Sequence, residues 1–113
     1  MHFDKDKLME RLDNDVELID QLLLLTKEYL KEFIPILENL IAENNISAIK
    51  SHVHKMKGTA LSVCFSNIAE QTAALELIEN YTDEKFLILK AKMTIEINYL
   101  IKMIDGKLNI FSQ

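Results

Sequence analysis

Between Val16 and Ile41, apolar residues recur every three or four positions, which is the spacing of one face of an α-helix. The recurring residues are Val16, Leu18 or Ile19, Leu22, Leu23, Leu25, Leu30, Phe33, Ile34, Leu37, Leu40 and Ile41. Asn14 is the candidate N-cap of this helix, because Glu17 follows it in the capping-box position. Pro35 should bend or break the helix, since proline removes one hydrogen bond of the ladder and crowds the preceding turn.

The rest of the chain shares this helical character. Two glycines and one proline among 113 residues, with 49% hydrophobic and 27% charged residues, argue against an all-β or loop-rich fold. Capping residues predict further helices at about 4–12, after Asn45 to about Cys64, after Ser66 to about Asn80, and after Thr82 to about Ile104. Because the connections are short, we expect an all-α fold: an up-down antiparallel four-helix bundle with a short additional N-terminal helix. It should form a single domain over residues 1–113, with its core at about 8–104.

Charge and hydropathy narrow the possible partners and locations. A net charge of −5 disfavours nucleic acid or an anionic membrane as the main partner. The apolar run from Leu22 to Leu25 is flanked by charged residues and cannot make the roughly 20-residue span of a bilayer. The N-terminus has no secretory signal, and the single cysteine, Cys64, agrees with a reducing compartment. We therefore expect a cytoplasmic protein without membrane insertion.

The densest group of histidines and lysines lies in "KSHVHKMKGTALSVC", residues 50–64. On a helix, the apolar stripe formed by Ile46, Ile49, Val53, Met56, Ala60 and Val63 is centred about 125° from His54. The face around His54 carries Ser47, Lys50, Ser51, Lys57, Gly58 and Leu61. An exposed neutral imidazole is a nucleophile near pH 7, and flanking ammonium groups attract a phosphoryl group. The alternative interpretation is an ordinary solvated, lysine-rich helix face.

The other two histidines do not indicate a metal site. His52 points about 200° away from His54, whereas paired metal ligands on a helix lie three or four residues apart. We expect His52 to border the core and His2 to lie in a frayed terminus. No Glu-x-x-His pair recurs on two helices, as a di-metal bundle requires, and no phosphate-binding P-loop pattern occurs. Neither a metal nor an ATP site is therefore expected.

The segment from His54 to Gly58, "HKMKG", resembles the H-x-[apolar]-K-G signature of the histidine-containing phosphotransfer (HPt) domains of two-component phosphorelays. Upstream, "LDNDVELIDQLLLLTKEYLKEFIPILENL" resembles the long helix of that family. Downstream, "FSNIAEQTAALE" resembles its next helix. The resemblance covers about residues 8–104 and implies a four-helix phosphocarrier.

The resemblance implies a role for each matching residue. His54 would be phosphorylated, Lys57 would assist the phosphoryl group, and Gly58 would give room to a docking receiver domain. Glu76, twenty-two positions after His54, would accept a hydrogen bond from its Nδ1 and leave Nε2 as the nucleophile. For Glu76, a plain exposed helix residue stays the alternative.

The resemblance also implies partners. Lys50, Lys55 and Leu61 are candidate contacts to a receiver domain of a response regulator or a hybrid histidine kinase, and any Mg²⁺ should lie in the acidic pocket of that receiver. For Phe65, docking and core packing are equally expected. The chain would then be a monomeric phosphocarrier rather than an enzyme. The alternatives are a helical docking module that transfers nothing, or the phosphorylation domain of a chemotaxis-type histidine kinase.

Cys64 is the one clear departure from the family pattern. Ten residues after the histidine the family usually has a second glycine, in the turn that closes the histidine helix, and this chain has Cys64 there. A non-glycine residue disfavours positive φ, so we expect the helix to end differently or to run a little longer.

Overall fold

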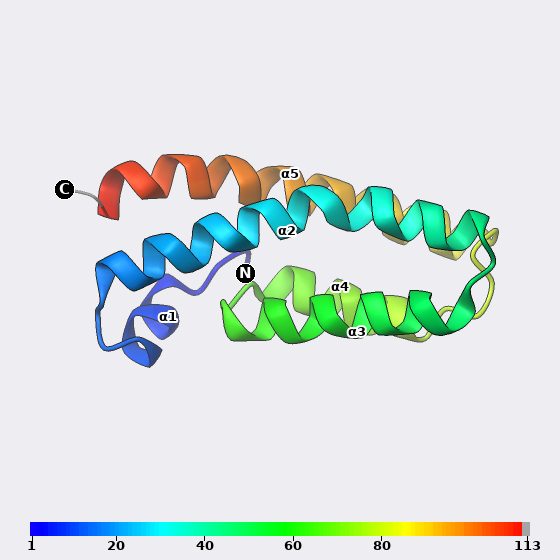
Figure 1. The fold of residues 1–113 in the computed structure, drawn as a ribbon, viewed down its shortest axis with the longest axis horizontal. Helices are drawn as coiled ribbons and strands as arrows, with labels where there is room; N and C mark the ends of the chain where they lie inside the picture. The colour runs from blue at the N-terminus through cyan, green and yellow to red at the C-terminus, as the bar shows by residue number, and fades with distance from the viewer. Residues whose placement is uncertain (112–113) are drawn as a thin grey trace.

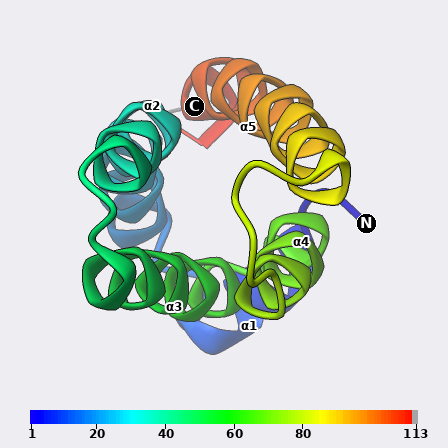
Figure 2. The same ribbon diagram turned by 90° about the vertical axis from the view of Figure 1, so that its right-hand side faces the viewer.

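The computed structural model describes the backbone of residues 1–111 and the side chains of residues 1–106. Its helices are α1 (Lys5–Arg11), α2 (Val16–Ala42), α3 (Ile46–Ser62), α4 (Ser66–Glu76) and α5 (Glu84–Phe111), and residues 1–111 contain no strand. The helices from α2 to α5 run alternately in opposite directions (Figure 1). Seen from its end, the bundle is a ring in which each of these four helices packs against two neighbours (Figure 2). The predicted up-down four-helix bundle with a short leading helix is confirmed.

The core lies inside this ring and follows the predicted apolar stripes. Its residues include Ile19, Leu23, Leu30, Phe33 and Leu37 of α2, Ile49, Val53, Met56 and Ala60 of α3, and Phe86, Met93, Leu100 and Ile104 of α5. Phe65 is only 1% exposed, so it is a core residue and not a docking contact. Ile46 was expected in the core stripe but is 42% exposed, because it begins α3 and borders a cleft beyond the end of α4.

α2 corrects one prediction, for its N-cap, and removes one of the two alternatives for Pro35. Asp15, not Asn14, is the N-cap, and its carboxylate accepts a hydrogen bond from the Leu18 N–H at 3.1 Å. Asn14 has a φ of 57° and belongs to the turn that ends α1. α2 also continues through Pro35 without a break. A single missing N–H is tolerated there because core residues on both sides, Phe33 and Leu37, hold the helix in place.

The other helix ends confirm the Asn45 cap and the approximate start of the last helix, and they shift the remaining boundaries. The Asn45 side chain caps α3 as predicted, by accepting from the Ala48 N–H at 3.2 Å. Ser66 is the first residue of α4 rather than its cap. α4 ends at Glu76 instead of Asn80, and the Asn80 side chain accepts from the Thr82 N–H at 2.9 Å in a turn further along the connection. α5 begins at Glu84 and extends beyond the expected end at Ile104.

Cys64 adopts the backbone conformation that a glycine would take. Its φ is 62°, its N–H donates to the Leu61 carbonyl at 3.3 Å, and the Phe65 N–H donates to the Ala60 carbonyl at 2.9 Å. These two bonds form a Schellman motif, which closes α3 at Ser62. The expectation that α3 would end differently or run to Cys64 is therefore wrong. The Cys64 side chain is buried and its carbonyl accepts from the Asp4 N–H at 2.9 Å, so tertiary contacts hold the residue in this strained region.

We expect Cys64→Gly to be more stable than Cys64→Ala by about 1 kcal/mol, the reverse of their order inside a helix. Both substitutions delete the sulfur, so their difference reports the cost of a Cβ at positive φ. Urea denaturation of the two variants measures it. An alanine variant as stable as the glycine variant would show that this turn is not strained.

The N-terminal arm is anchored rather than frayed. The His2 Nδ1 lies 2.7 Å from the Glu96 Oε2, and the His2 ring stacks on Tyr99 with 3.8 Å between ring centroids. The Met1 carbonyl accepts from the Asn67 N–H at 3.0 Å. The expectation for His2 is wrong because Glu96 is only 6% exposed and a buried carboxylate requires a partner.

Candidate functional site

His54 lies in the middle of α3 on the outer surface of the bundle, and its side chain is 74% exposed. His52 points the other way, as expected. Its ring stacks on Phe33 with 4.5 Å between ring centroids, and its Nε2 lies 2.9 Å from the Phe33 carbonyl oxygen. Of these two histidines, His54 is the one that a partner protein can reach.

The side chains of His54, Lys57 and Glu76 form one cluster across the α3–α4 interface. Lys57 is three residues after His54 on the same helix, and Glu76 is the last residue of α4. The Lys57 Nζ lies 2.6 Å from the Glu76 Oε1, and the His54 Nδ1 lies 3.6 Å from the Glu76 Oε2. The second distance is long for a hydrogen bond, so the carboxylate is bonded to Lys57 and only near the imidazole.

This cluster changes the expectation for two residues. Lys57 was expected to be exposed, but its side chain is 31% exposed and paired with Glu76. The alternative for Glu76 was a plain exposed helix residue, but its side chain is 28% exposed and faces both Lys57 and His54. Both placements follow from the end of α4, which brings Glu76 against α3. The roles of His54, Lys57 and Glu76 in phosphotransfer stay predictions.

The hydrogen bond from Lys57 holds the pKa of the Glu76 carboxyl below its ordinary value. Desolvation acts in the opposite direction, and the nearby His54 lowers the pKa further. Glu76 is therefore ionised at neutral pH and presents a hydrogen-bond acceptor to the Nδ1 side of His54.

We expect Lys57→Ala to raise the pKa of Glu76 toward its ordinary value, because the variant loses the largest cause of the shift. Since the folded-state pKa is depressed, the Lys57–Glu76 pair stabilises the protein above the pKa of an unfolded glutamate. That contribution is lost as pH falls through the folded-state pKa. NMR titration of the Glu76 side-chain carboxyl carbon tests this, and equal titration midpoints in the two proteins would contradict it.

The four residues expected to contact a partner, Lys50, Lys55, Gly58 and Leu61, all belong to α3, as His54 does. A Cβ on Gly58 would meet no atom within 4 Å, so neither packing nor a positive φ requires glycine there. Leu61 is 56% exposed, and Lys50 is exposed on the same face. Lys55 lies toward α2, with its Nζ 5.2 Å from the centroid of the Tyr29 ring.

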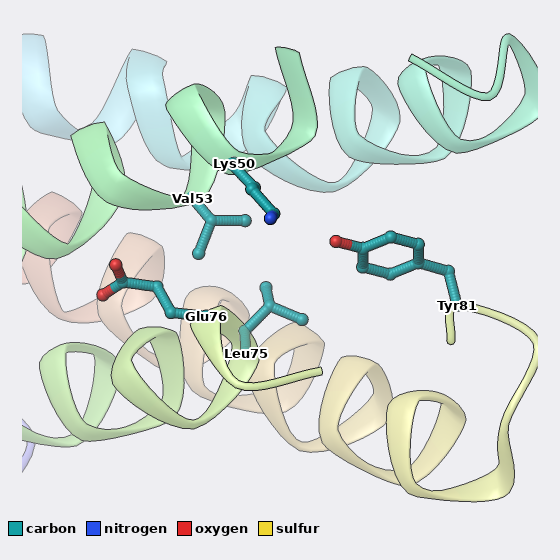
Figure 3. A pocket seen from close by; sticks show the side chains of 5 residues that line it. All are labelled: Lys50, Val53, Leu75, Glu76 and Tyr81. Atoms are coloured by element: carbon teal, nitrogen blue, oxygen red, sulfur yellow. The ribbon is translucent and has the colours of Figure 1, made fainter. Parts of the chain in front are cut away.

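Sequence reasoning missed Tyr81. This residue lines a cleft with Lys50, Val53, Leu75 and Glu76 (Figure 3). Because it lies in the connection between α4 and α5, outside any helical pattern, no periodicity or motif could single it out.

Among the side chains of residues 1–106, no group of three His, Cys, Asp or Glu residues could hold a metal ion. Over the helices that the structure describes, none is long and apolar enough to cross a membrane.

Comparison with known proteins identifies the family. The family model described as "Hpt domain" matches residues 6–85, which is more than half of the chain. The chain therefore belongs to the Hpt domain family, whose members are phosphocarriers of phosphorelays and interact with receiver domains. No curated protein and no solved structure matches the chain.

Proposed function

We propose that His54 accepts a phosphoryl group from a phospho-aspartate of one receiver domain and passes it to an aspartate of another. The observation that carries this proposal is the position of the His54 ring, exposed to a partner on one side and facing the Glu76 carboxylate with its Nδ1. The match to the Hpt domain family supports the same role.

The cluster suits each step of the transfer. A proton on Nδ1 directed at Glu76 leaves the lone pair of Nε2 free to attack phosphorus. The Nε2–P bond forms, the bond from phosphorus to the aspartate oxygen breaks, and the aspartate leaves as a carboxylate. Nδ1 keeps its proton, so the phosphorylated ring carries a positive charge that the ionised Glu76 stabilises. Transfer to the second receiver reverses these steps.

Lys57 must change partner during this reaction. In the unphosphorylated protein its ammonium is bonded to Glu76 at 2.6 Å. Lys57 lies one helical turn from His54, so a phosphoryl group on Nε2 offers it oxygen atoms of higher negative charge. We propose that Lys57 then binds the phosphoryl group, while Glu76 stays with the imidazolium. Any Mg²⁺ belongs to the acidic pocket of the receiver.

The docking surface is proposed to extend from His54 over Gly58 and Leu61 to α2. The pairs His52–Phe33 and Lys55–Tyr29 set the antiparallel register of α3 against α2. This register puts Leu25, which is 72% exposed, near the level of Gly58. Leu25 and Leu61 thus supply apolar contacts on either side of Gly58, which has no side chain. Lys50 and Lys55 complement the charge of the acidic receiver pocket.

The test is transfer from a phosphorylated receiver domain to the unmodified protein and to His54→Gln. We expect an acid-labile, alkali-stable label on the unmodified protein and on the control His52→Gln, with circular dichroism verifying that both variants fold. The His54→Gln variant should take no label. Label that persists in His54→Gln, or no label from any of several phosphodonors, would contradict the proposal.

The same assay separates the two alternatives. A docking module would take no label at all. Cys64 was the one residue that favoured such a module, and its glycine-like conformation weakens that argument. The phosphorylation domain of a chemotaxis-type kinase would be labelled from ATP by a kinase domain and then discharged by a receiver.

A further inference from the structure

We propose that the cleft beside His54 receives one acidic side chain of the docking receiver domain. The inference rests on the proposed function and adds a specific contact to it. The cleft has a volume of about 170 Å³ and is lined by Lys50, Val53, Leu75, Glu76 and Tyr81 (Figure 3). This inner volume is enough for the end of one side chain.

The cleft exists because α4 is short. α4 ends at Glu76, so the first turns of α3 extend beyond it. The chain then crosses the end of the bundle as the α4–α5 connection (Figure 2). Ile46, Leu77, Ile78 and Glu79 border the outer part of the same depression, which opens to solvent.

Tyr81 is held firmly at the edge of this cleft. Its ring packs edge-on against Phe86 with 5.5 Å between ring centroids, and Phe86 is 2% exposed. The adjoining turn is fixed by the Asn80 side chain, which accepts from the Thr82 N–H. Figure 3 shows the Tyr81 hydroxyl pointing across the cleft toward the Lys50 ammonium. Within residues 1–106 this hydroxyl has no hydrogen-bond partner, so it is available to a ligand.

The charges in the inner part of the cleft, away from Glu79 at its outer edge, favour an acidic occupant. Glu76 is already bonded to Lys57 at 2.6 Å, whereas Lys50 forms no ion pair with any side chain of residues 1–106. The inner cleft thus offers one uncompensated ammonium and one hydroxyl donor above an apolar floor of Val53 and Leu75, each 2% exposed. A carboxylate on a short aliphatic stem, as in glutamate, complements both features. A lysine or arginine would face the ammonium group of Lys50.

The cleft also lies where a receiver must dock. Lys50 is four residues before His54 and therefore one turn away on the same face of α3. A receiver that brings its aspartate to the His54 imidazole is proposed to cover the mouth of the cleft as well. The surface around a receiver's phosphorylated aspartate is acidic, which matches the unpaired Lys50.

The test compares Lys50→Met and Tyr81→Phe with the matched controls Lys92→Met and Tyr99→Phe. Both controls lie on α5, which packs against α2 and α4 but not against α3. We expect each cleft substitution to lower the second-order rate constant for transfer from a phosphorylated receiver about tenfold, and the controls to leave it unchanged. The loss of rate in the cleft variants should be much larger with the receiver as phosphodonor than with phosphoramidate, because phosphoramidate has no side chain to insert into the cleft.

A double-mutant cycle identifies the occupant. Each acidic residue that surrounds the Mg²⁺-binding pocket of the receiver, but does not belong to that pocket, is replaced by glutamine and combined with Lys50→Met. At one acidic position of the receiver, the reductions in transfer rate caused by the glutamine substitution and by Lys50→Met should not add, since either substitution removes the same contact. Additive losses at every acid, unchanged rates in both cleft variants, or equal losses with phosphoramidate would each overturn the inference while leaving phosphotransfer intact. Absence of label on His54 in the unmodified protein would instead overturn the proposed function and this inference with it.

Discussion

Replacing Gly58 with glutamine is expected to lower the rate of transfer from a receiver domain about a hundredfold while stabilising the fold by about 0.5 kcal/mol. The two effects have separate causes. Gly58 lies inside α3, where glycine costs helix stability, and a Cβ there meets no atom within 4 Å. A partner that approaches His54 closely meets the added side chain instead, which displaces its aspartate from the imidazole. Stopped-flow transfer kinetics and urea denaturation measure the two effects.

Gly106 provides the matched control. It also lies in a helix, α5, and a Cβ on it also meets no atom within 4 Å. Gly106→Gln should therefore gain helix stability but transfer at the rate of the unmodified protein. Equal loss of transfer in both variants, or normal transfer in Gly58→Gln, would contradict a close approach over Gly58.

Replacing Lys57 with alanine is expected to slow phosphorylation of His54 about a hundredfold or more, without unfolding the bundle. The ammonium is proposed to stabilise the negative charge that develops on the transferred phosphoryl oxygens. The fold should survive, because the ion pair with Glu76 is partly exposed and lies outside the core. In contrast to Gly58→Gln, this variant should be slow with phosphoramidate as well as with a receiver, since the defect lies in the chemistry rather than in docking.

Two further variants separate charge from packing. Lys57→Met keeps most of the apolar stem and should be as slow as Lys57→Ala, whereas Lys57→Arg should retain part of the rate. Circular dichroism checks that all three variants fold. A Lys57→Met variant with normal rates would mean that the ammonium does not take part in transfer.

The sequence was sufficient to predict the helices because each apolar stripe repeats over many turns. The His54 face could be predicted for the same reason, since its distance from the stripe depends only on helical geometry. The helix ends were harder, because several short polar residues compete for each cap. Asp15 rather than Asn14 caps α2, and Asn80 forms a turn instead of ending α4.

The features that the sequence did not reveal depend on tertiary contacts. Cys64 has a positive φ because burial and the hydrogen bond from Asp4 compensate its strain. His2 is ordered because Glu96, ninety-four residues away, needs a partner. The Lys57–Glu76 bond and the Tyr81 cleft both follow from the point at which α4 ends, which no local pattern specified.

The most direct test of the account is to locate the phosphoryl group on the protein itself. The ¹⁵N-labelled chain is phosphorylated, and the histidine ring nitrogens are then assigned by long-range ¹H–¹⁵N NMR at alkaline pH. We predict that the His54 Nε2 carries phosphorus and that its Nδ1 does not, while the rings of His2 and His52 stay unmodified. A phosphoryl group on Nδ1 of His54, on another histidine, or on no histidine at all would contradict the proposed phosphotransfer at Nε2 of His54.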